Sequence, residues 1–154
     1  MKLPNNLHLV SREDVNDLLS SFSKHGFRLE DRDWPSVEHY FQAMKFEDTE
    51  YQEKIRLAEH PKKARKLGRT RRRKIRHDWS KVRTVMMTRG LYTKCKAHPE
   101  VAEALLNTGD IHIQEISLYD YFWGTGRDAR GKNAYGQVLM NIRDKLRKEM
   151  KSAG

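Results

Sequence analysis

Apolar residues along the chain mostly recur at helical spacing, and short alternating runs lie between these segments. The last helix is the clearest, because its apolar positions form one stripe while basic residues occupy the outer face. That stripe consists of Tyr135, Val138, Leu139, Ile142, Leu146 and Met150. A second long helix is predicted from Trp79 to Cys95, where similar spacing continues past Gly90, a residue expected to weaken it.

Capping residues predict several shorter helices. Ser, Thr and Pro favour the first positions of a helix, whereas Gly favours its end. The expected segments begin near Val37 after Ser36, run from Glu50 to about Glu59 after Thr49, from Pro61 to Gly68, and from Pro99 to Gly109. A brief helical turn is also expected between Ser11 and Leu19.

Strand-like alternation predicts short strands at 7–10, 26–29 and 111–116. The second of these is expected to run into a turn at residues 30–33, which leads to Trp34. Asn133 is expected to cap the last helix. Together these patterns predict a single domain over residues 1–154 that is mainly α-helical, an α+β fold with minor short strands.

The net charge of +10 is concentrated in one segment. Ten of the 31 basic residues lie between Lys62 and Arg76, a stretch that contains no acidic residue. The remainder of the chain carries 21 basic and 21 acidic residues, so there is no general basic bias. Such a cluster is typical of nucleic-acid binding, with Arg71, Arg72 and Arg73 as candidate contacts, but a solvated basic face has the same composition.

Composition excludes several other classes of site. Cys95 is the single cysteine, so no internal disulfide can form, and without a Cys/His cluster we expect neither a metal site nor a cofactor. No apolar run approaches the roughly 20 residues that cross a bilayer. The N-terminus lacks the residue order of a secretory signal, so a cytoplasmic protein without membrane contact is expected.

The stretch from Trp34 to Phe46 interleaves polar and apolar residues. Glu38, Gln42 and Lys45 fall on one helical face, since seven residues nearly complete two turns. The residues between them are too apolar for a helix that only lies on the surface. Charged groups embedded in such a wall are candidates for chemistry, although an ordinary solvated stripe gives the same spacing.

The stretch from Asp120 to Asn133 combines three consecutive aromatic residues with three glycines. Glycines allow tight turns and let a ligand approach the backbone closely. The free N–H groups at the start of the following helix suit a phosphate. The alternative is a packed aromatic corner with a flexible turn, and the P-loop pattern is missing.

In these two stretches the chain resembles the NADAR or YbiA-like N-glycosidases, and the resemblance extends from about Leu19 to Leu146. The first shared motif is an aromatic residue, Ser or Thr, any residue, Glu-His-Tyr, an aromatic residue, Gln-Ala, any residue and Lys. The second is Asp120, two residues, Trp123-Gly124, and then Gly131-Lys132-Asn133. Supporting matches are Ser21-Phe22, where the family has Ser-Asn-Phe, residues 64–69, and Glu115.

The resemblance implies hydrolysis of the N-glycosidic bond between a ribose phosphate or ADP-ribose and an amino-substituted base. Family members act on early ribosylamino-pyrimidine intermediates of riboflavin synthesis, or on ADP-ribosylated guanine in DNA. We expect the DNA substrate, because a riboflavin intermediate carries one phosphate and does not require ten clustered cations. An ADP-ribosyltransferase toxin is then a possible functional partner. The alternative from another class is a non-catalytic module that binds ADP-ribose or nucleic acid.

Matching positions imply the residues of the site. Glu38 and Lys45 would be the catalytic pair, joined by Asp120, which also shapes the site. Substrate-binding roles are implied for Trp34, Ser36, His39, Gln42, Arg69, Glu115, Trp123, Gly124, Lys132 and Asn133. Among these, the Trp123 indole is expected to stack on base or ribose, and the last three residues are expected near the phosphates.

The chemistry of the reaction fits these residue types. Cleavage of a ribose C1–N bond builds positive charge on the sugar, which a carboxylate such as Glu38 stabilises, and a carboxyl group can carry a proton to the leaving nitrogen. An amine attacks only when unprotonated, so a nucleophilic Lys45 needs a pKa lowered from about 10.4 by burial or a nearby cation. The rival role for Lys45 is that of a fixed cation.

Overall fold

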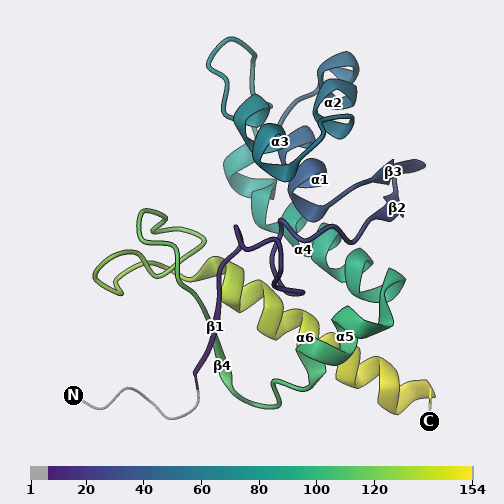
Figure 1. Cartoon of the computed structure of the whole chain (residues 1–154), viewed down its shortest axis with the longest axis vertical. Coiled ribbons are helices and arrows are strands. Elements are labelled where there is room, and N and C mark those ends of the chain that lie inside the picture. Colours follow the sequence, from purple (N-terminus) through teal and green to yellow (C-terminus); the bar gives the residue numbers. More distant parts are fainter. Residues whose placement is uncertain (1–6, 154) are drawn as a thin grey trace.

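The computed structural model describes residues 7–153 and shows six helices and four short strands in that range (Figure 1). The helices are α1 (Val37–Ala43), α2 (Thr49–Arg56), α3 (Pro61–Gly68), α4 (Trp79–Ala97), α5 (Pro99–Leu106) and α6 (Ala134–Ala153). The strands are β1 (Leu7–Val10), β2 (Phe27–Leu29), β3 (Arg32–Trp34) and β4 (His112–Glu115). The predicted class, mainly helical with minor strands, is confirmed.

Helix α1 lies at the centre of the fold. All seven of its residues are buried, and it packs against α2, α3 and α4. Figure 1 shows α2 and α3 beside α1 at one end of the molecule, while α5 and α6 occupy the other end, joined to it by the long helix α4. No helix in the described part of the chain has the length and apolar character needed to cross a membrane.

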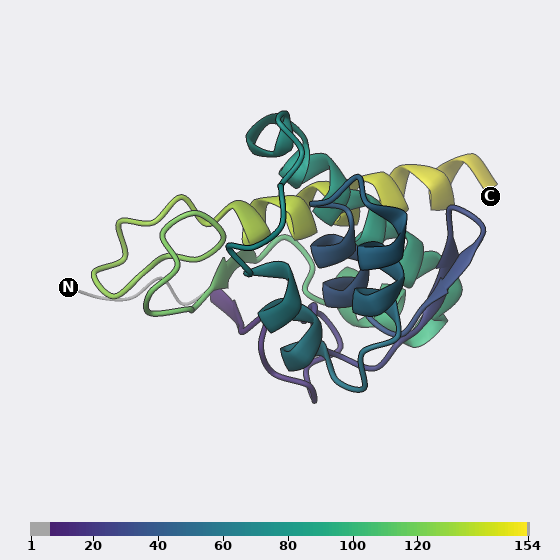
Figure 2. The same ribbon diagram turned by 90° about the horizontal axis from the view of Figure 1, so that it is seen from above.

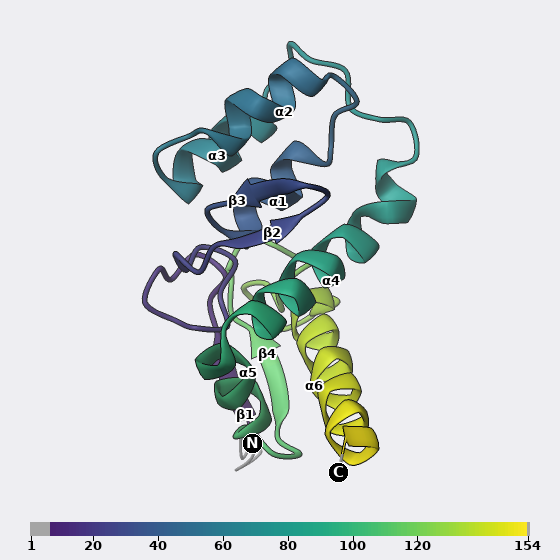
Figure 3. The same cartoon turned by 90° about the vertical axis from the view of Figure 1, so that its right-hand side faces the viewer.

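The strands form two small two-stranded sheets. Strands β1 and β4 pair in parallel, from Leu7 opposite His112 to Val10 opposite Glu115, and β4 packs against α6. Strands β2 and β3 form an antiparallel hairpin that lies beside α1 (Figure 3). Its turn residues Glu30 and Asp31 both have positive φ, as a two-residue type I′ turn requires.

The structure corrects several predicted boundaries. Asp48, not Thr49, caps α2, because the Asp48 carboxylate accepts from the N–H groups of residues 50 and 51. The segment from Ser11 to Leu19 forms successive turns and no helix. Helix α2 ends at residue 56 and α5 at residue 106, while the strand predicted at 111–116 is limited to 112–115.

The prediction for Asn133 was wrong, whereas the predicted weakening of α4 by Gly90 stays a prediction. Gly90 does not interrupt α4; it faces α1, where a Cβ atom would come within 3.2 Å of Val37 and 3.3 Å of Tyr40. The Asn133 side chain does not cap α6. Its Oδ1 accepts from the Glu115 N–H at 2.8 Å and its Nδ2 donates to the Ile113 carbonyl at 2.9 Å, so it ties the start of α6 to β4.

Candidate active site

Glu38 lies in the first turn of α1 and is fully buried. Four side chains donate to its carboxylate. Ser21 Oγ and Arg12 Nη2 reach Oε1 at 2.8 and 3.3 Å, while Gln42 Nε2 and Arg65 Nε reach Oε2 at 2.8 and 3.1 Å. The carboxylate is therefore held in one orientation by two guanidinium groups, a hydroxyl and an amide.

Electrostatics keep Glu38 ionised. Burial alone would raise the pKa of this carboxyl, but Arg12 and Arg65 outweigh that effect and lower the pKa from 4.5 to about 2. At neutral pH Glu38 is thus a carboxylate. It can stabilise positive charge or accept a proton, and it delivers a proton to a leaving group only after it has first taken one up.

The turns of residues 11–23 bring Arg12 and Ser21 to α1. Phe22 N–H and Ser21 Oγ both donate to the Arg12 carbonyl, which closes this segment on itself. The Glu38 N–H then donates to the Ser21 carbonyl at 2.9 Å and joins the segment to the helix. The neighbouring carbonyls are held by two distant residues: Lys94 Nζ donates to residues 18 and 20, and Tyr135 Oη donates to residue 19.

The two arginines extend the site in opposite directions. Arg65, on α3, also pairs with Glu13 at the surface. Arg12 Nη1 contacts Asp120 Oδ2 at 3.1 Å, and Asp120 Oδ1 accepts from the N–H groups of residues 122 and 123. We refer to the series Glu13, Arg65, Glu38, Arg12 and Asp120 as the ion-pair chain.

Lys45 is half-buried and lies in the turn that follows α1, so the prediction that the helix includes it was wrong. Its Nζ donates to the Gly68 carbonyl at 2.7 Å, and no ion pair joins it to Glu38 in the described structure. Burial and the nearby Arg69 lower the pKa of Lys45, and the Glu38 charge opposes this shift without cancelling it. The neutral amine is therefore more accessible than in a solvated lysine.

Three buried polar atoms around Glu38 lack a hydrogen-bond partner. They are Arg12 Nε, Arg65 Nη2 and Gln42 Oε1, three of the five such atoms found within residues 7–153. Buried polar groups are nearly always paired. The four contacts of Glu38 therefore leave part of the hydrogen-bonding capacity of its neighbours unused, and one of these atoms, Gln42 Oε1, faces Gly68.

The other predicted residues of the first motif hold α1 in place. Ser36 caps the helix, and His39 links it to the α2–α3 connection through a hydrogen bond from Nε2 to the Ala58 carbonyl at 2.9 Å. The Ser36 hydroxyl therefore donates to His39 Nδ1, at 2.7 Å, and burial lowers the pKa of this imidazole. Trp34 is buried, and its Nε1 donates to the Leu29 carbonyl at 2.9 Å.

The second motif forms a closely packed loop before α6. Glu115 accepts from the Arg12 N–H and from Ser117, and the close packing of Gly124 leaves 2.3 Å between a Cβ atom there and Glu115 Oε1. Trp123 is buried with its ring edge-to-face against Phe41 at 5.5 Å. Its stacking on a substrate stays a prediction. Lys132 is exposed on the same loop.

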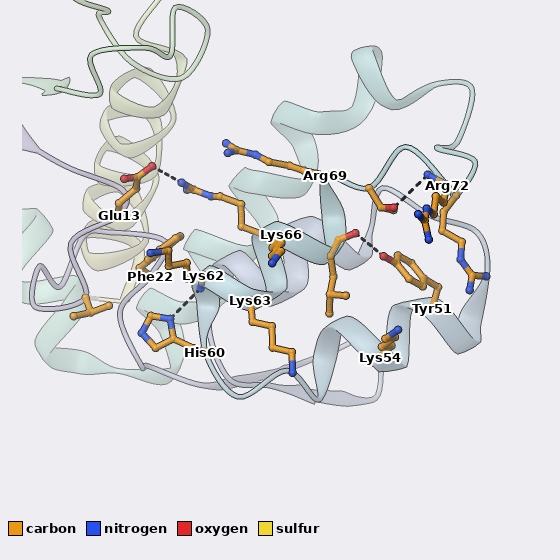
Figure 4. Close-up of a pocket in the computed structure, with 15 residues that line it drawn as sticks. Glu13, Phe22, Tyr51, Lys54, His60, Lys62, Lys63, Lys66, Arg69 and Arg72 are labelled. Atoms are coloured by element: carbon orange, nitrogen blue, oxygen red, sulfur yellow. Dashed lines mark hydrogen bonds and ion pairs between the residues drawn. The ribbon is translucent and has the colours of Figure 1, made fainter.

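The basic run forms a groove over α2 and α3, which we call the basic groove (Figure 4). Its lining includes Arg69, Arg72 and Arg73 together with Arg65, so the groove meets the ion-pair chain at Arg65. Arg71 is exposed but is not part of the lining. Further cations in the groove are Lys54, Lys62, Lys63 and Lys66.

Few of the groove cations are neutralised. Within the described residues, acidic partners are found for three members of the run from Lys62 to Arg76. Arg65 pairs with Glu38 and Glu13, Arg73 pairs with Asp48 at 3.3 Å, and Arg76 pairs with Asp78. The other cations of this run give the surface a positive potential that is open to solvent.

Three residues around Glu38 were not predicted from the sequence. Arg12 gave no signal, because a single arginine in a turn follows no periodic pattern. Ser21 and Arg65 lay within the supporting family matches at Ser21-Phe22 and residues 64–69, but neither was singled out, and Arg65 is one of many cations in the basic run.

The sequence matches a known protein family and several known proteins. The model of the NADAR domain matches residues 9–147. An N-glycosidase of Nostoc punctiforme is 38% identical over 138 residues, which are 88% of each chain. A riboflavin biosynthesis protein of Vibrio vulnificus is 35% identical over 140 residues, which are 91% of this chain and 38% of that protein.

A relative of known structure is similar to this chain in both sequence and fold. N-glycosidase YbiA of Escherichia coli (strain K12) is 36% identical over 140 residues, 91% of this chain and 88% of the relative. The NMR structure of Escherichia coli YbiA matches with a TM-score of 0.86 at 33% identity and covers 97% of this chain and 89% of that chain. The chain therefore belongs to the NADAR family and is an N-glycosidase, a hydrolase that acts on N-glycosyl compounds.

Proposed function

We propose that this enzyme hydrolyses the bond between C1 of ADP-ribose and the amino group of guanine in DNA, and so reverses DNA ADP-ribosylation. The observation that carries this proposal is the buried, ionised Glu38 at the centre of an ion-pair chain in which Arg65 and Glu13 line the basic groove. One site then combines a carboxylate, which can stabilise positive charge on the sugar, with a positively charged surface, which can bind the polyanionic DNA. An ADP-ribosyltransferase toxin would supply the modified base.

The residues divide the chemistry between them. In the ring-opened ribosyl amine, C1 is an electrophilic imine carbon, to which neutral Lys45 can add through Nζ. The base then leaves as its free amine after the C1–N bond breaks, and C1 remains joined to Lys45 as a Schiff base. Water hydrolyses that bond and restores the lysine. Glu38 accepts a proton during the additions and returns it to the leaving nitrogen.

The basic groove favours DNA over a small substrate. Cations without acidic partners destabilise one another, and phosphates bound along the groove relieve that repulsion. A ribosylamino-pyrimidine phosphate has too few charges to occupy it. That second substrate is nevertheless favoured by one finding, the similarity to a protein named for riboflavin biosynthesis.

A direct comparison of substrates tests the proposal. The protein is incubated with an oligonucleotide that carries ADP-ribosylated guanine and, separately, with the phosphorylated ribosylamino-pyrimidine, and released base is measured over many turnovers. We expect turnover of the oligonucleotide to exceed that of the small substrate. Glu38→Gln should abolish it, and Glu103→Gln, an exposed glutamate on α5, should not.

The other outcomes are equally informative. Faster turnover of the pyrimidine would assign the enzyme to the riboflavin intermediate. Tight binding of the oligonucleotide with release of no base from either substrate would support a non-catalytic binding module and would contradict the proposal.

A further inference from the structure

Residues 116–132, which we call the aromatic loop, expose an unusual number of apolar side chains. Tyr119 is 81% exposed, Leu118 54%, Tyr121 46% and Ile116 43%. Single exposed apolar residues are normal on a protein surface, but a cluster within six positions marks a contact site. The loop projects from the start of α6, away from the helices (Figures 1 and 2).

The aromatic loop is ordered by its own hydrogen bonds. Gly126 N–H donates to the Ser117 carbonyl at 3.2 Å, Gly131 N–H to the Thr125 carbonyl at 2.7 Å, and Lys132 N–H to the Tyr121 carbonyl at 2.9 Å. Gly126, with φ of 74°, lies directly against the Tyr121 ring, where a Cβ atom would be 2.4 Å from it. The Tyr121 ring therefore lies on a fixed support, which lowers the entropy cost of binding a flat partner.

The position of the loop relates it to the active site. Asp120 lies between the two tyrosines in sequence and ends the ion-pair chain, since it is the Asp120 carboxylate that contacts Arg12. The basic groove meets that chain on the other side of Glu38, at Arg65. Tyr119 and Tyr121, as the neighbours of Asp120 in sequence, therefore lie at one end of the ion-pair chain, and the basic groove adjoins the other end.

The charge of the loop indicates the class of its ligand. Arg127, Arg130 and Lys132 are exposed, against one exposed acid, Asp128, which pairs with Arg130 at 3.6 Å. Asp120 is occupied by Arg12. Exposed aromatic rings interspersed with cations match the way proteins bind single-stranded nucleic acids, in which bases stack on the rings and cations contact the backbone.

We infer that Tyr119 and Tyr121 form a second nucleic-acid contact, which stacks on unpaired bases beside the modified nucleotide. This inference rests on the proposed function and makes it more specific: the substrate is single-stranded or locally unpaired DNA. A paired duplex keeps its bases stacked on one another and offers the rings no base face.

Binding and turnover together test this contact. Affinity for an unmodified single-stranded oligonucleotide is measured by fluorescence anisotropy for the wild type and for the double variant Tyr119→Ala/Tyr121→Ala. We expect a loss of at least about tenfold, since stacking contributes about 1–3 kcal/mol per base. Affinity for the matching duplex should change little. Turnover of ADP-ribosylated guanosine as a free nucleoside should be retained, while turnover of the modified single strand falls.

Matched variants separate stacking from folding. Tyr119→Phe/Tyr121→Phe keeps the rings and should keep the affinity. Met150→Ala, which removes an exposed apolar residue near the far end of α6, should have no effect. If the double alanine variant does not fold, the most exposed position alone, Tyr119→Ala, gives the same test.

Several results would overturn the inference. Unchanged affinity of the double alanine variant for the single strand would contradict the inference and favour a protein partner for the loop. An equal loss of affinity for the duplex would exclude base stacking. Loss of nucleoside turnover would mean that the rings only shape the catalytic site. Failure of the wild type to release base from any substrate would contradict the proposed function, while the binding measurements would still decide the role of the loop.

Discussion

Glu38 gains its chemical character from its neighbours. A buried carboxyl without partners would be protonated at neutral pH, but the two arginines reverse that tendency and keep the group charged. Arginine suits this task because its guanidinium remains charged even when buried. Glu38, which the spacing of α1 indicated, is thus a carboxylate at neutral pH because Arg12 and Arg65 reach it from other parts of the chain.

The first prediction concerns acid stability. Because the folded-state pKa of Glu38 is depressed from 4.5 to about 2, its stabilisation is fully present above pH 4.5 and is lost as the pH falls to about 2. This shift corresponds to about 3 kcal/mol. Denaturant unfolding between pH 5 and pH 2 should show a steeper loss of free energy for the wild type than for Glu38→Gln. Parallel pH curves for the two proteins would mean that the arginines do not lower this pKa.

The second prediction concerns Lys45, whose lowered pKa makes the neutral amine available. Borohydride added during turnover should reduce the Schiff base and leave the sugar on Lys45, where peptide mass mapping finds it. Lys45→Arg keeps the charge but has no accessible neutral form, so it should abolish both trapping and turnover. The exposed Lys148→Arg serves as control. Near-normal turnover of Lys45→Arg would show that only the charge matters.

At this scale the sequence indicated Glu38 and Gln42 but not the partners of Glu38. Glu38 and Gln42 lie on α1, where spacing fixes which residues share a face, whereas Lys45 lies in the turn just beyond the helix and not on it as predicted. The partners of Glu38 are separated from it by 26 residues for Arg12 and 27 for Arg65. No local pattern relates residues that far apart, so only the fold shows which of the 31 cations are buried against the carboxylate.

Among the elements, the packing of α1 against α3 determines the geometry around Lys45. Gly68 at the end of α3 accepts from Lys45 Nζ and lies so close to Gln42 that a Cβ atom would be 2.0 Å from its Oε1. This close approach explains why residue 68 is a glycine, in addition to the preference for glycine at the end of a helix. It also connects the two proposed catalytic residues, because Gln42 donates to Glu38 and Gly68 accepts from Lys45.

The third prediction follows from this contact. Gly68→Ala should displace Gln42 from Glu38, reduce turnover by at least about tenfold and destabilise the fold by about 1–3 kcal/mol, the range for overpacked sites. Turnover and denaturant unfolding measure the two effects. In the Gln42→Ala background the methyl group that Gly68→Ala adds no longer meets an amide at position 42. Gly68→Ala should therefore lower turnover and the free energy of unfolding less in that background than in the wild type. Additive effects would exclude the contact as the cause.

Element prediction succeeded where the signal is local and failed where it is not. Ser36 and Pro61 start α1 and α3 as predicted, because caps act within one turn. Asn133 has the same local signal but uses its side chain to hold β4, since tertiary contacts compete for its two polar atoms. The hairpin strand Arg32–Trp34 was missed because its turn is made by Glu30 and Asp31, residues less typical of positive φ than Gly or Asn.

In the whole molecule, the parallel pairing of β1 with β4 joins two distant segments of the chain. This pairing places Val10 opposite Glu115, so that Arg12 and Asp120 emerge from the same end of the sheet and can meet. Sequence periodicity does not encode which strands pair. The mainly helical class was therefore predictable, whereas the junction that completes the site was not.

The fourth prediction concerns the basic groove as a whole. If it holds DNA, each phosphate contact releases counterions, and the logarithm of the affinity falls with the logarithm of salt concentration by about 0.7–0.9 per contact. Arg72 and Arg73 line the groove and Arg71 adjoins them. Replacing these three arginines with glutamine should flatten the slope by up to about 2–3 and weaken binding of all sequences alike. Oligonucleotide titrations at several salt concentrations measure this change.

The control must remove the same charge from another face of the protein. Lys145, Lys148 and Lys151 are exposed on α6, far from the groove, and their replacement with glutamine lowers the net charge equally. A general effect of net charge would flatten the slope in both triple variants, because long-range attraction depends on the total charge. A specific groove predicts flattening only for the arginine variant. An unchanged slope in that variant would exclude DNA from the basic groove.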